Sequence, residues 1–257
     1  MKVAFWNGVS PSKGITNHVA AIGMILACEM NCTVVLGSNY ICNHMLQDCF
    51  SYKRKEAGMD QEPYCFYHGT PEYFRALWDM RLNRKGNILE VPMEGVTIIY
   101  PPDEHRMFYY PVLPTTLYLL DVAGENNTAC QSALDEADML IVFLPQDVTE
   151  FQKFFTRFSS LIPKALFVID DFCRNGTVSC RDIASKYGIS RRNIGLIPHD
   201  SKYTEMCETG RLDLFLNGKL NQATKEPQYR FLISLRTIAK RVYERLKHEQ
   251  MKEGKHE

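Results

Sequence analysis

Apolar runs of four to six residues, each followed by turn residues or by a helical pattern, recur along the chain. The first run spans residues 3–6, a turn rich in small residues follows, and apolar residues then recur at helical spacing up to position 27. This pattern predicts a buried strand, a turn and an amphipathic helix.

The same order of strand and helix repeats further along. Buried strands are predicted at residues 33–36, 96–100, 117–120, 139–144, 165–169 and 194–197. Helical patterns are predicted around residues 44–46, 74–82, 133–134, 179–188 and 229–247. We expect a surface excursion at 51–69, and a loop around 107–110 whose aromatic side chains are either buried or form a contact surface. Strands that alternate with helices are typical of α/β proteins with an open parallel sheet.

The turn between the first strand and the first helix is the first candidate for chemistry. Backbone N–H groups and the helix dipole make such a turn attractive to an anion, above all a phosphate. A P-loop reads G-x-x-x-x-G-K-[ST]. If Gly14 is its second glycine and Thr16 its metal-binding hydroxyl, Ile15 occupies the lysine position, and Lys13 is the neighbouring cation that could reach a phosphate. A plain strand-to-helix turn is the alternative interpretation.

Carboxylates follow two of the later strands. Asp121 follows the run 117–120, and Gly124 comes shortly afterwards. In a nucleotide switch such an aspartate reaches magnesium and the glycine N–H senses the terminal phosphate, although D-x-x-G also occurs in ordinary turns. Asp170 and Asp171 follow another strand. Because neighbouring strand residues point to opposite faces, we do not expect these two to form a catalytic pair.

The final helix combines an apolar stripe with many basic residues. The stripe consists of Phe231, Leu235, Ile238, Val242 and Leu246, and the basic residues are Arg236, Lys240, Arg241, Arg245 and Lys247. We expect the stripe to cover one side of the sheet while the charges are solvated. A basic amphipathic helix can also lie on an anionic membrane or bind a partner, which is the alternative.

Length and charge favour a single balanced domain. The chain has 257 residues, 30 basic and 30 acidic, for a net charge of +0. This balance argues against a protein dominated by nonspecific nucleic-acid binding. No stretch reaches the roughly 20 apolar residues of a spanning helix, so a cytoplasmic protein is predicted. We expect one domain over residues 1–247 and a frayed tail over 248–257.

Nine cysteines raise the question of disulfides or a metal site. The odd number and the apolar surroundings of many of them favour buried free thiols. The densest group is Cys28, Cys32, Cys42 and Cys49, with His44 among them. Its spacing matches no usual zinc-ligand pair, so no structural metal is expected.

Together these stretches resemble the ParA/MinD family of P-loop ATPases, in the branch that includes pilus-assembly localisation proteins of the TadZ/CpaE kind. The resemblance lies in FWNGVSPSKGITNHVAAI, LYLLDVAG, ALDEADMLIVFLPQD, LFVIDDF, NIGLIPHD and the final helix, and leaves out residues 51–114. It implies a mostly parallel sheet with helices on both faces, binding of ATP and Mg²⁺ at the first turn, and a homodimer that docks partners or surfaces.

Carried onto this sequence, the resemblance implies a set of site residues. Magnesium would face Thr16 and Asp121, Gly124 would lie in the switch, and Asp170 stands where the family often has a base-reading asparagine. The segment 198–200 would pack on the adenine. The residues implied in nucleotide binding are Ser12, Lys13, Gly14, Ile15, Thr16, Asn17, Gly124, Asp170, Pro198 and Asp200.

Departures from the family pattern lower the expected activity. Ile15 replaces the P-loop lysine, and Gly37, Ser38 and Asn39 stand where a catalytic aspartate would follow the second strand. Two hypotheses remain. The chain either binds a nucleotide with little hydrolysis and acts as a dimerisation and localisation switch, or it is a pseudo-ATPase scaffold for a pilus, division or partitioning machine. Contact with a membrane surface or with DNA is a minor expectation.

Overall fold

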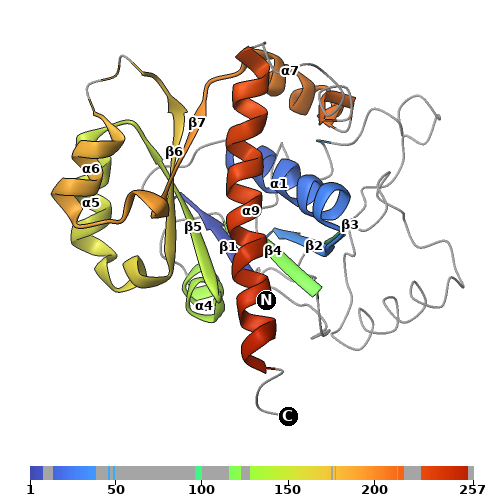
Figure 1. Cartoon of the computed structure of the whole chain (residues 1–257), viewed down its shortest axis with the longest axis horizontal. Coiled ribbons are helices and arrows are strands. Elements are labelled where there is room, and N and C mark those ends of the chain that lie inside the picture. Colours follow the sequence, from blue (N-terminus) through green and yellow to red (C-terminus); the bar gives the residue numbers. More distant parts are fainter. Residues whose placement is uncertain are drawn as a thin grey trace, which may run out of the picture.

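The core of the protein is one seven-stranded parallel sheet (Figure 1). The computed structural model describes residues 1–7, 14–38, 46, 49, 96–99, 116–122, 128–174, 176, 178–212, 214–216 and 227–253. The strands are β1 (Lys2–Trp6), β2 (Thr33–Ser38), β3 (Val96–Ile99), β4 (Thr116–Val122), β5 (Met139–Pro145), β6 (Ala165–Phe172) and β7 (Ile194–Pro198), in the order β3-β2-β4-β1-β5-β6-β7. Since every pair is parallel, all strands end at one edge of the sheet.

Helices cover both faces of this sheet. The helices are α1 (Gly14–Met30), α4 (Thr128–Glu136), α5 (Val148–Arg157), α6 (Cys180–Tyr187), α7 (Ser201–Glu208) and α9 (Pro227–Glu253), with short 3₁₀ helices η2 (Ser159–Lys164) and η3 (Arg191–Asn193). One apolar core joins the sheet to α1, α7 and α9, and a second joins it to α4, α5 and α6. The strands are apolar on both sides because both faces are covered.

The alternation of strand residues decides what faces α1. Val3 and Phe5 belong to the core on the α1 side, and Ala4 and Trp6 to the opposite core. Helix α1 also lies very close to the sheet, since a Cβ added at Gly23 would stand 2.7 Å from a terminal carbon of Leu36. The helix therefore packs closely on the face of the sheet at β2 and β4.

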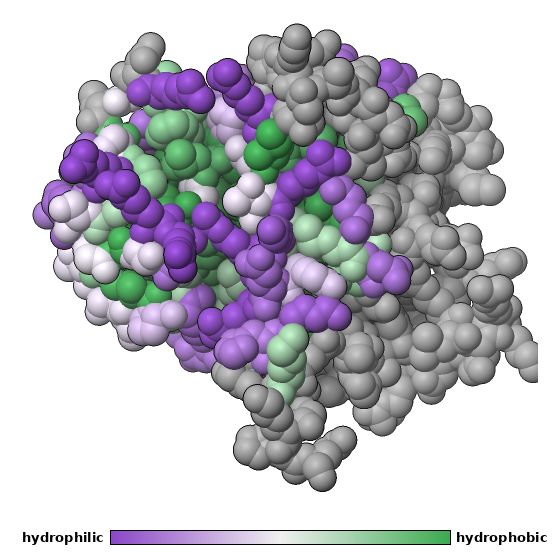
Figure 2. Space-filling model, in the orientation of Figure 1, coloured by the Kyte–Doolittle hydropathy of each residue, from purple (hydrophilic) through white to green (hydrophobic). Residues whose placement is uncertain are grey.

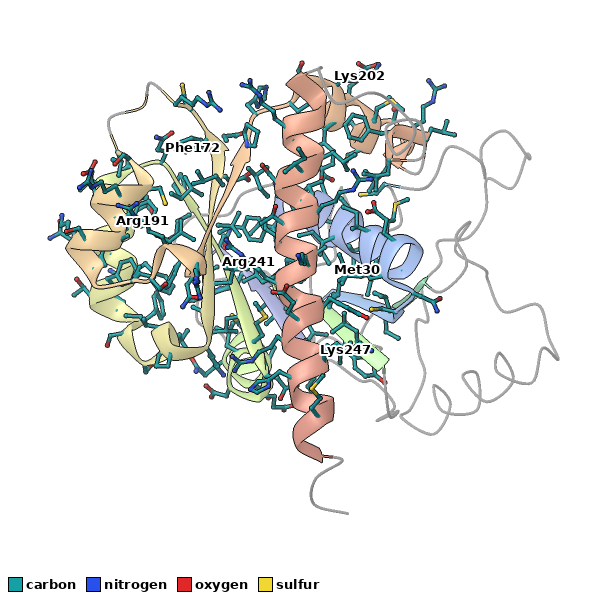
Figure 3. The ribbon with its side chains drawn as sticks, in the orientation of Figure 1. Met30, Phe172, Arg191, Lys202, Arg241 and Lys247 are labelled. Atoms are coloured by element: carbon teal, nitrogen blue, oxygen red, sulfur yellow. The ribbon has the colours of Figure 1, made fainter. Side chains whose placement is uncertain are left out.

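The long helix α9 packs with its apolar stripe inward, as predicted. All five stripe residues are buried, and the helix contacts α1 and β7. Arg236 Nε donates to both carboxylate oxygens of Glu29 on α1, at 3.0 and 2.8 Å. Figure 2 shows the outward face of α9 as hydrophilic, and Figure 3 shows the side chains that fill the layer between it and the strands.

The predicted strands are confirmed, with differences at some element ends. The helix predicted at 179–188 runs from Cys180 to Tyr187, with Ser179 as its N-cap and Gly188, at φ 64°, as its C-cap. Two helices, α5 and α7, are additional to the prediction. The final helix runs from Pro227 to Glu253, beyond the predicted end at residue 247, and the frayed tail stays a prediction. No glycine or proline interrupts 248–253, and Gly254 comes directly after it.

Several predictions fall on parts of the chain outside the described residues. These are the helices around 44–46, apart from Leu46, and 74–82, the excursion at 51–69 and the loop at 107–110. The six cysteines that the structure describes are free thiols: Cys32, Cys49, Cys130 and Cys207 are buried, Cys180 is half-buried and Cys173 is exposed. Over the described ranges, no helix combines the length and apolar character needed to cross a membrane, and no three potential ligands gather at a metal-binding distance.

Candidate functional site

The candidate site lies along the edge where the parallel strands end. Ligands of open α/β sheets bind in the crevice outside the carboxyl ends of the strands. Helix α1 begins shortly after β1 at this edge, and Asp121 and Asp170 stand near the ends of β4 and β6. Leu119 and Val168, two positions before each aspartate, belong to the core on the α1 side. Alternation therefore turns both carboxylates toward α1.

Thr16 and Asp121 form the first pair at this edge. The Thr16 hydroxyl Oγ1 donates to Asp121 Oδ2 at 2.8 Å. Both residues are buried, at 8% and 3% relative exposure, although they lie 105 positions apart in the sequence. The sheet register thus brings together the two residues that the sequence singled out as metal-facing.

This pair fits a magnesium ion by its chemistry. Mg²⁺ prefers oxygen ligands and is usually held by one or two carboxylates together with phosphate oxygens and water. A hydroxyl and a carboxylate oxygen in hydrogen-bond contact are close enough to be shared by one cation. The described residues that could hold the ion are therefore Thr16 and Asp121.

The position of the usual P-loop lysine is part of the apolar core. Ile15 is only 4% exposed and belongs to the core cluster on the α1 side. Next to Thr16, Asn17 is buried and its Oδ1 accepts a hydrogen bond from Cys49 Sγ at 3.4 Å. The described part of this turn therefore offers main-chain N–H groups to an anion, and the Thr16 hydroxyl, whose proton goes to Asp121, keeps lone pairs for a cation. Ser12 and Lys13 lie outside the described residues, as does Gly124.

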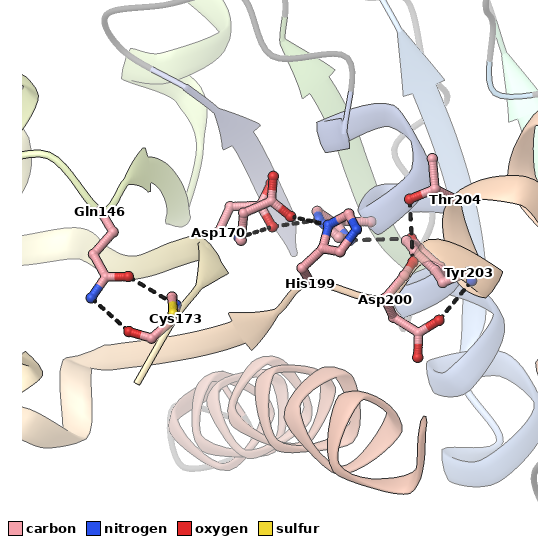
Figure 4. A network of polar contacts seen from close by, with 9 residues as sticks. Gln146, Asp170, Cys173, His199, Asp200, Tyr203 and Thr204 are labelled. Carbon is pink, nitrogen blue, oxygen red and sulfur yellow. Dashed lines mark hydrogen bonds and ion pairs between the residues drawn. The ribbon is translucent and has the colours of Figure 1, made fainter. Parts of the chain in front are cut away.

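His18, one turn into α1, contacts residues of two other elements at the same sheet edge. Figure 4 shows both of these residues, Asp170 and Tyr203. His18 Nε2 lies 2.9 Å from Asp170 Oδ1 of β6, and His18 Nδ1 lies 3.1 Å from the Tyr203 hydroxyl of α7. The imidazole is stacked between the rings of Phe143 and Tyr203, with centroids 5.3 and 5.5 Å away and interplanar angles of 7° and 5°. Because an ionised carboxylate only accepts, Nε2 carries the proton, and in the neutral ring Nδ1 accepts from the Tyr203 hydroxyl.

The surroundings shift the pKa values of two members of this group in opposite directions. Burial alone would raise the pKa of Asp170, but the charge and hydrogen bond of His18, the N–H of Asp171 and the more distant His199 outweigh it, so the pKa is lowered. For Tyr203, burial and then the nearby thiols of Cys207 and Cys49 raise the pKa well above its ordinary value. Asp170 is therefore held as a carboxylate, and Tyr203 is a neutral hydrogen-bonding group, which argues against a nucleophilic Asp–His–Tyr triad.

The residues beside Asp170 have separate tasks. Asp171 adopts φ 49°, a left-handed conformation, and its Oδ1 pairs with His199 Nδ1 at 3.0 Å. Asp200 caps α7, since its Oδ1 accepts from the Tyr203 N–H at 2.9 Å. The two adjacent aspartates thus have different partners, and the Asp200 side chain stabilises a helix. Pro198, the last residue of β7, lies opposite Phe172 in the sheet register.

Gln146, directly after β5, holds the loop that follows β6 (Figure 4). Its Oε1 accepts from the Cys173 N–H at 2.8 Å, and its Nε2 donates to the carbonyls of Cys173 and Val178 at 3.0 and 2.7 Å. Gly176 lies against this amide, because an added Cβ would be 2.4 Å from Nε2. The loop next to Asp170 therefore has a fixed anchor on a neighbouring strand.

Sequence reasoning found the carboxylates and missed their partners. Thr16 and Asp121 are in contact, and Asp170 stands at the same sheet edge as expected. His18, Tyr203 and Gln146 were not predicted. A histidine between buried helix positions was a weak signal for His18, but nothing in the sequence indicates which distant residues complete its hydrogen bonds.

Solved structures with the same architecture belong to the MinD and ParA proteins. The chain is similar to the MinD cell division protein of Aquifex aeolicus, with a TM-score of 0.60 and 15% identity over 95% of this chain and 97% of that one. It is also similar to the septum site-determining protein MinD of Pyrococcus horikoshii OT3 complexed with Mg-ADP, with a TM-score of 0.62 and 12% identity over 94% and 96%. A third similar structure is a ParA family ATPase from Chlorobium tepidum TLS, with a TM-score of 0.58 and 13% identity over 92% of this chain and 98% of that one. The chain has a ParA/MinD-like P-loop NTPase fold.

These likenesses concern the fold, since identity is low in each case. No protein-family model matches the sequence, and no curated protein matches it either. The α/β class and the ParA/MinD-like architecture expected from the sequence are confirmed. The pilus-assembly branch stays a prediction.

Proposed function

We propose that this protein binds a nucleotide at the carboxyl ends of β1 and β4, with its phosphates against the first turn of α1. The observation that carries the proposal is the buried hydrogen bond between Thr16 Oγ1 and Asp121 Oδ2. A buried polar pair in contact at the crevice edge suits a magnesium-bound phosphate. Bound Mg²⁺ would offset phosphate charge. Thr16 and Asp121 would position it, and the N–H groups at the start of α1 would orient the phosphates.

The same site supports little hydrolysis. Phosphoryl transfer depends on positioned charges that stabilise the transition state. Position 15 holds a buried isoleucine, and the sequence places Gly37, Ser38 and Asn39 where a catalytic aspartate would follow β2. We infer that ATP or another nucleotide is bound weakly and turned over slowly, if at all.

A bound nucleotide that persists suits a dimerisation and localisation switch. Among the structural neighbours is a MinC:MinD cell division complex from Aquifex aeolicus, at a TM-score of 0.58. We propose a cytoplasmic homodimer that binds a protein of a pilus, division or partitioning system, with peripheral membrane attachment as an option. The balanced charge supports a DNA partner least.

A second candidate is a scaffold that has lost nucleotide binding. The packing of Ile15 in the core favours it, because no cation extends from that position toward a phosphate. In that case the protein would bind partners through its surface alone.

Thermal unfolding with ATP, ADP or GTP, with and without Mg²⁺, separates the two candidates. A ligand at one hundred times its dissociation constant stabilises the folded state by about 2.7 kcal/mol. We expect a Mg²⁺-dependent rise in Tm for the wild type and a much smaller one for Asp121→Asn. An unchanged Tm at millimolar concentrations of all three nucleotides would reject nucleotide binding and support the scaffold. Lys13→Ala tests whether that lysine supplies the missing charge: undiminished affinity would exclude this role.

A further inference from the structure

The end of β6, at the same edge of the sheet, holds an acceptor at a distance that suits the base of the proposed nucleotide. Asp170 of β6 is two strands away from β1, across β5. Neighbouring strands lie about 4.8 Å apart, so the separation is roughly 10 Å along the sheet edge. With its phosphates at α1, a nucleotide lying along the strand ends would bring its base toward β6.

The two oxygens of Asp170 are not equivalent. Oδ1 faces His18 Nε2 at 2.9 Å and accepts from the Asp171 N–H at 3.0 Å. Within the described residues, Oδ2 has no hydrogen-bond partner, although the side chain is only 18% exposed. Both lone pairs of Oδ2 therefore remain available to a ligand.

His18 holds Oδ1 of Asp170 in place. Its ring is 5% exposed and lies between Phe143 and Tyr203, so it cannot turn without breaking this packing. The hydrogen bonds of His18 Nε2 and the Asp171 N–H to Oδ1 then restrict rotation of the carboxylate. The hydrogen bonds and charge that His18 and Asp171 provide also favour the ionised form, which only accepts.

Such an acceptor discriminates between the two purines. The Watson–Crick edge of guanine presents N1–H and the N2 amino group side by side, which are two donors for one oxyanion. On either edge of adenine, the amino group stands beside an unprotonated ring nitrogen, N1 or N7, whose lone pair a carboxylate repels. On the basis of the proposed nucleotide site, we propose that Asp170, positioned by His18, reads the donor edge of guanine and makes this protein prefer guanine over adenine nucleotides.

Calorimetric titration of the full-length protein with non-hydrolysable GTP and ATP analogues, and with ITP, tests the proposal in the presence of Mg²⁺. We expect the GTP analogue to bind at least tenfold more tightly than the ATP analogue. ITP keeps N1–H and lacks the 2-amino group, so its affinity should fall between the two. This series needs no variant and therefore does not depend on the folding of a mutant.

Asp170→Asn and Asp171→Asn form a matched pair of variants. An amide both donates and accepts, so Asp170→Asn should bring the GTP-to-ATP affinity ratio close to one. Asp171→Asn changes the neighbouring, exposed carboxylate and should leave the ratio as it is in the wild type.

Each outcome of the titration has a distinct meaning. Equal binding of both nucleotides, or tighter binding of ATP, overturns the guanine preference and leaves the proposed nucleotide site standing. If Asp170→Asn keeps the wild-type ratio of GTP to ATP affinity, Asp170 is not the residue that selects guanine. Failure of all three ligands to bind would overturn the proposed function and, with it, this inference.

Discussion

Asp121 and Asp170 occupy equivalent places at the ends of two strands and are held in different ways. Each stands near the carboxyl end of a parallel strand and faces α1. Asp121 pairs with the hydroxyl of Thr16 at 2.8 Å, whereas Asp170 pairs with the imidazole of His18 at 2.9 Å. A hydroxyl can accept a cation while its hydrogen turns away. The stacked imidazole has both nitrogens engaged and must stay in place.

In the proposed function, this difference separates recruitment of a ligand from orientation of a ligand. The Thr16–Asp121 pair would hold the Mg²⁺ of the bound nucleotide. At the Asp170 end, the described residues bind Oδ1 of the carboxylate and leave Oδ2 for a ligand. Changes at the first end should therefore alter the response to ligand most, and changes at the second should alter the stability of the fold most.

The largest expected effect is that of His18→Ala. Its removal takes one hydrogen-bond partner each from the part-buried Asp170 carboxylate and the buried Tyr203 hydroxyl, and opens a cavity between the rings of Phe143 and Tyr203. Breaking a buried pair in this way costs about 3–5 kcal/mol. Urea unfolding measures the loss. His199→Ala breaks the exposed pair with Asp171 and should cost less than about 1 kcal/mol. Similar losses for the two variants would contradict the proposed role of His18.

Asp121→Ala comes next. It takes a hydrogen-bond acceptor away from the buried Thr16 hydroxyl, at a cost of about 2 kcal/mol. Asp121→Asn keeps an acceptor and should cost less stability. Both variants should lose the Mg²⁺-dependent part of ligand stabilisation, which thermal unfolding with and without Mg²⁺ measures. If either variant keeps the full Mg²⁺-dependent stabilisation, Asp121 does not hold the cation, and the contrast with Asp170 fails.

Gly176→Ala tests the anchor beside Asp170. The new methyl would displace the Gln146 amide and disrupt its three hydrogen bonds, for a loss of about 1–2 kcal/mol. Gln146→Ala should cost about the same. Because both changes remove the same interactions, the double variant should be little less stable than either single one. Additive losses in denaturant unfolding would show that Gly176 acts independently of Gln146.

The smallest effect concerns acid pH. The pKa of Asp170 is lower in the folded protein than the value of about 3.9 in the unfolded chain. Its contribution to stability is therefore fully present above pH ~3.9 and is lost as the pH falls through the folded-state pKa. The free energy of unfolding should decline less between pH 5 and the acid limit in Asp170→Asn than in the wild type. If the free energy of unfolding falls with pH in the same way in both proteins, Asp170 does not cause the loss of stability in acid.

The sequence was most informative where a residue's environment depends on its neighbours in the chain. The apolar runs located the strands because both faces of a parallel sheet are buried, and a polar residue after such a run marks the ligand edge. Asp121 and Asp170 were found in this way. The short helices α5 and α7 could have been found from their N-caps, since Asp147 accepts from the N–H groups of Thr149 and Glu150, and Asp200 from that of Tyr203.

Partners that are distant in the sequence could not be predicted. His18 meets Asp170 and Tyr203 across 152 and 185 positions, and only the strand order brings these residues together. The environment of position 15 could not be predicted from the sequence either. Ile15 revealed the missing charge, but only the packing shows that its side chain belongs to the core.

That packing would make a lysine at position 15 costly. A lysine introduced there must either place its ammonium at a site that is 4% exposed or turn outward and leave the volume of the isoleucine empty. The first choice desolvates a charge, and the second creates a cavity in the core. Introducing this lysine by one substitution therefore carries a folding penalty, and the surrounding core would have to be repacked before the position could present a cation to a phosphate.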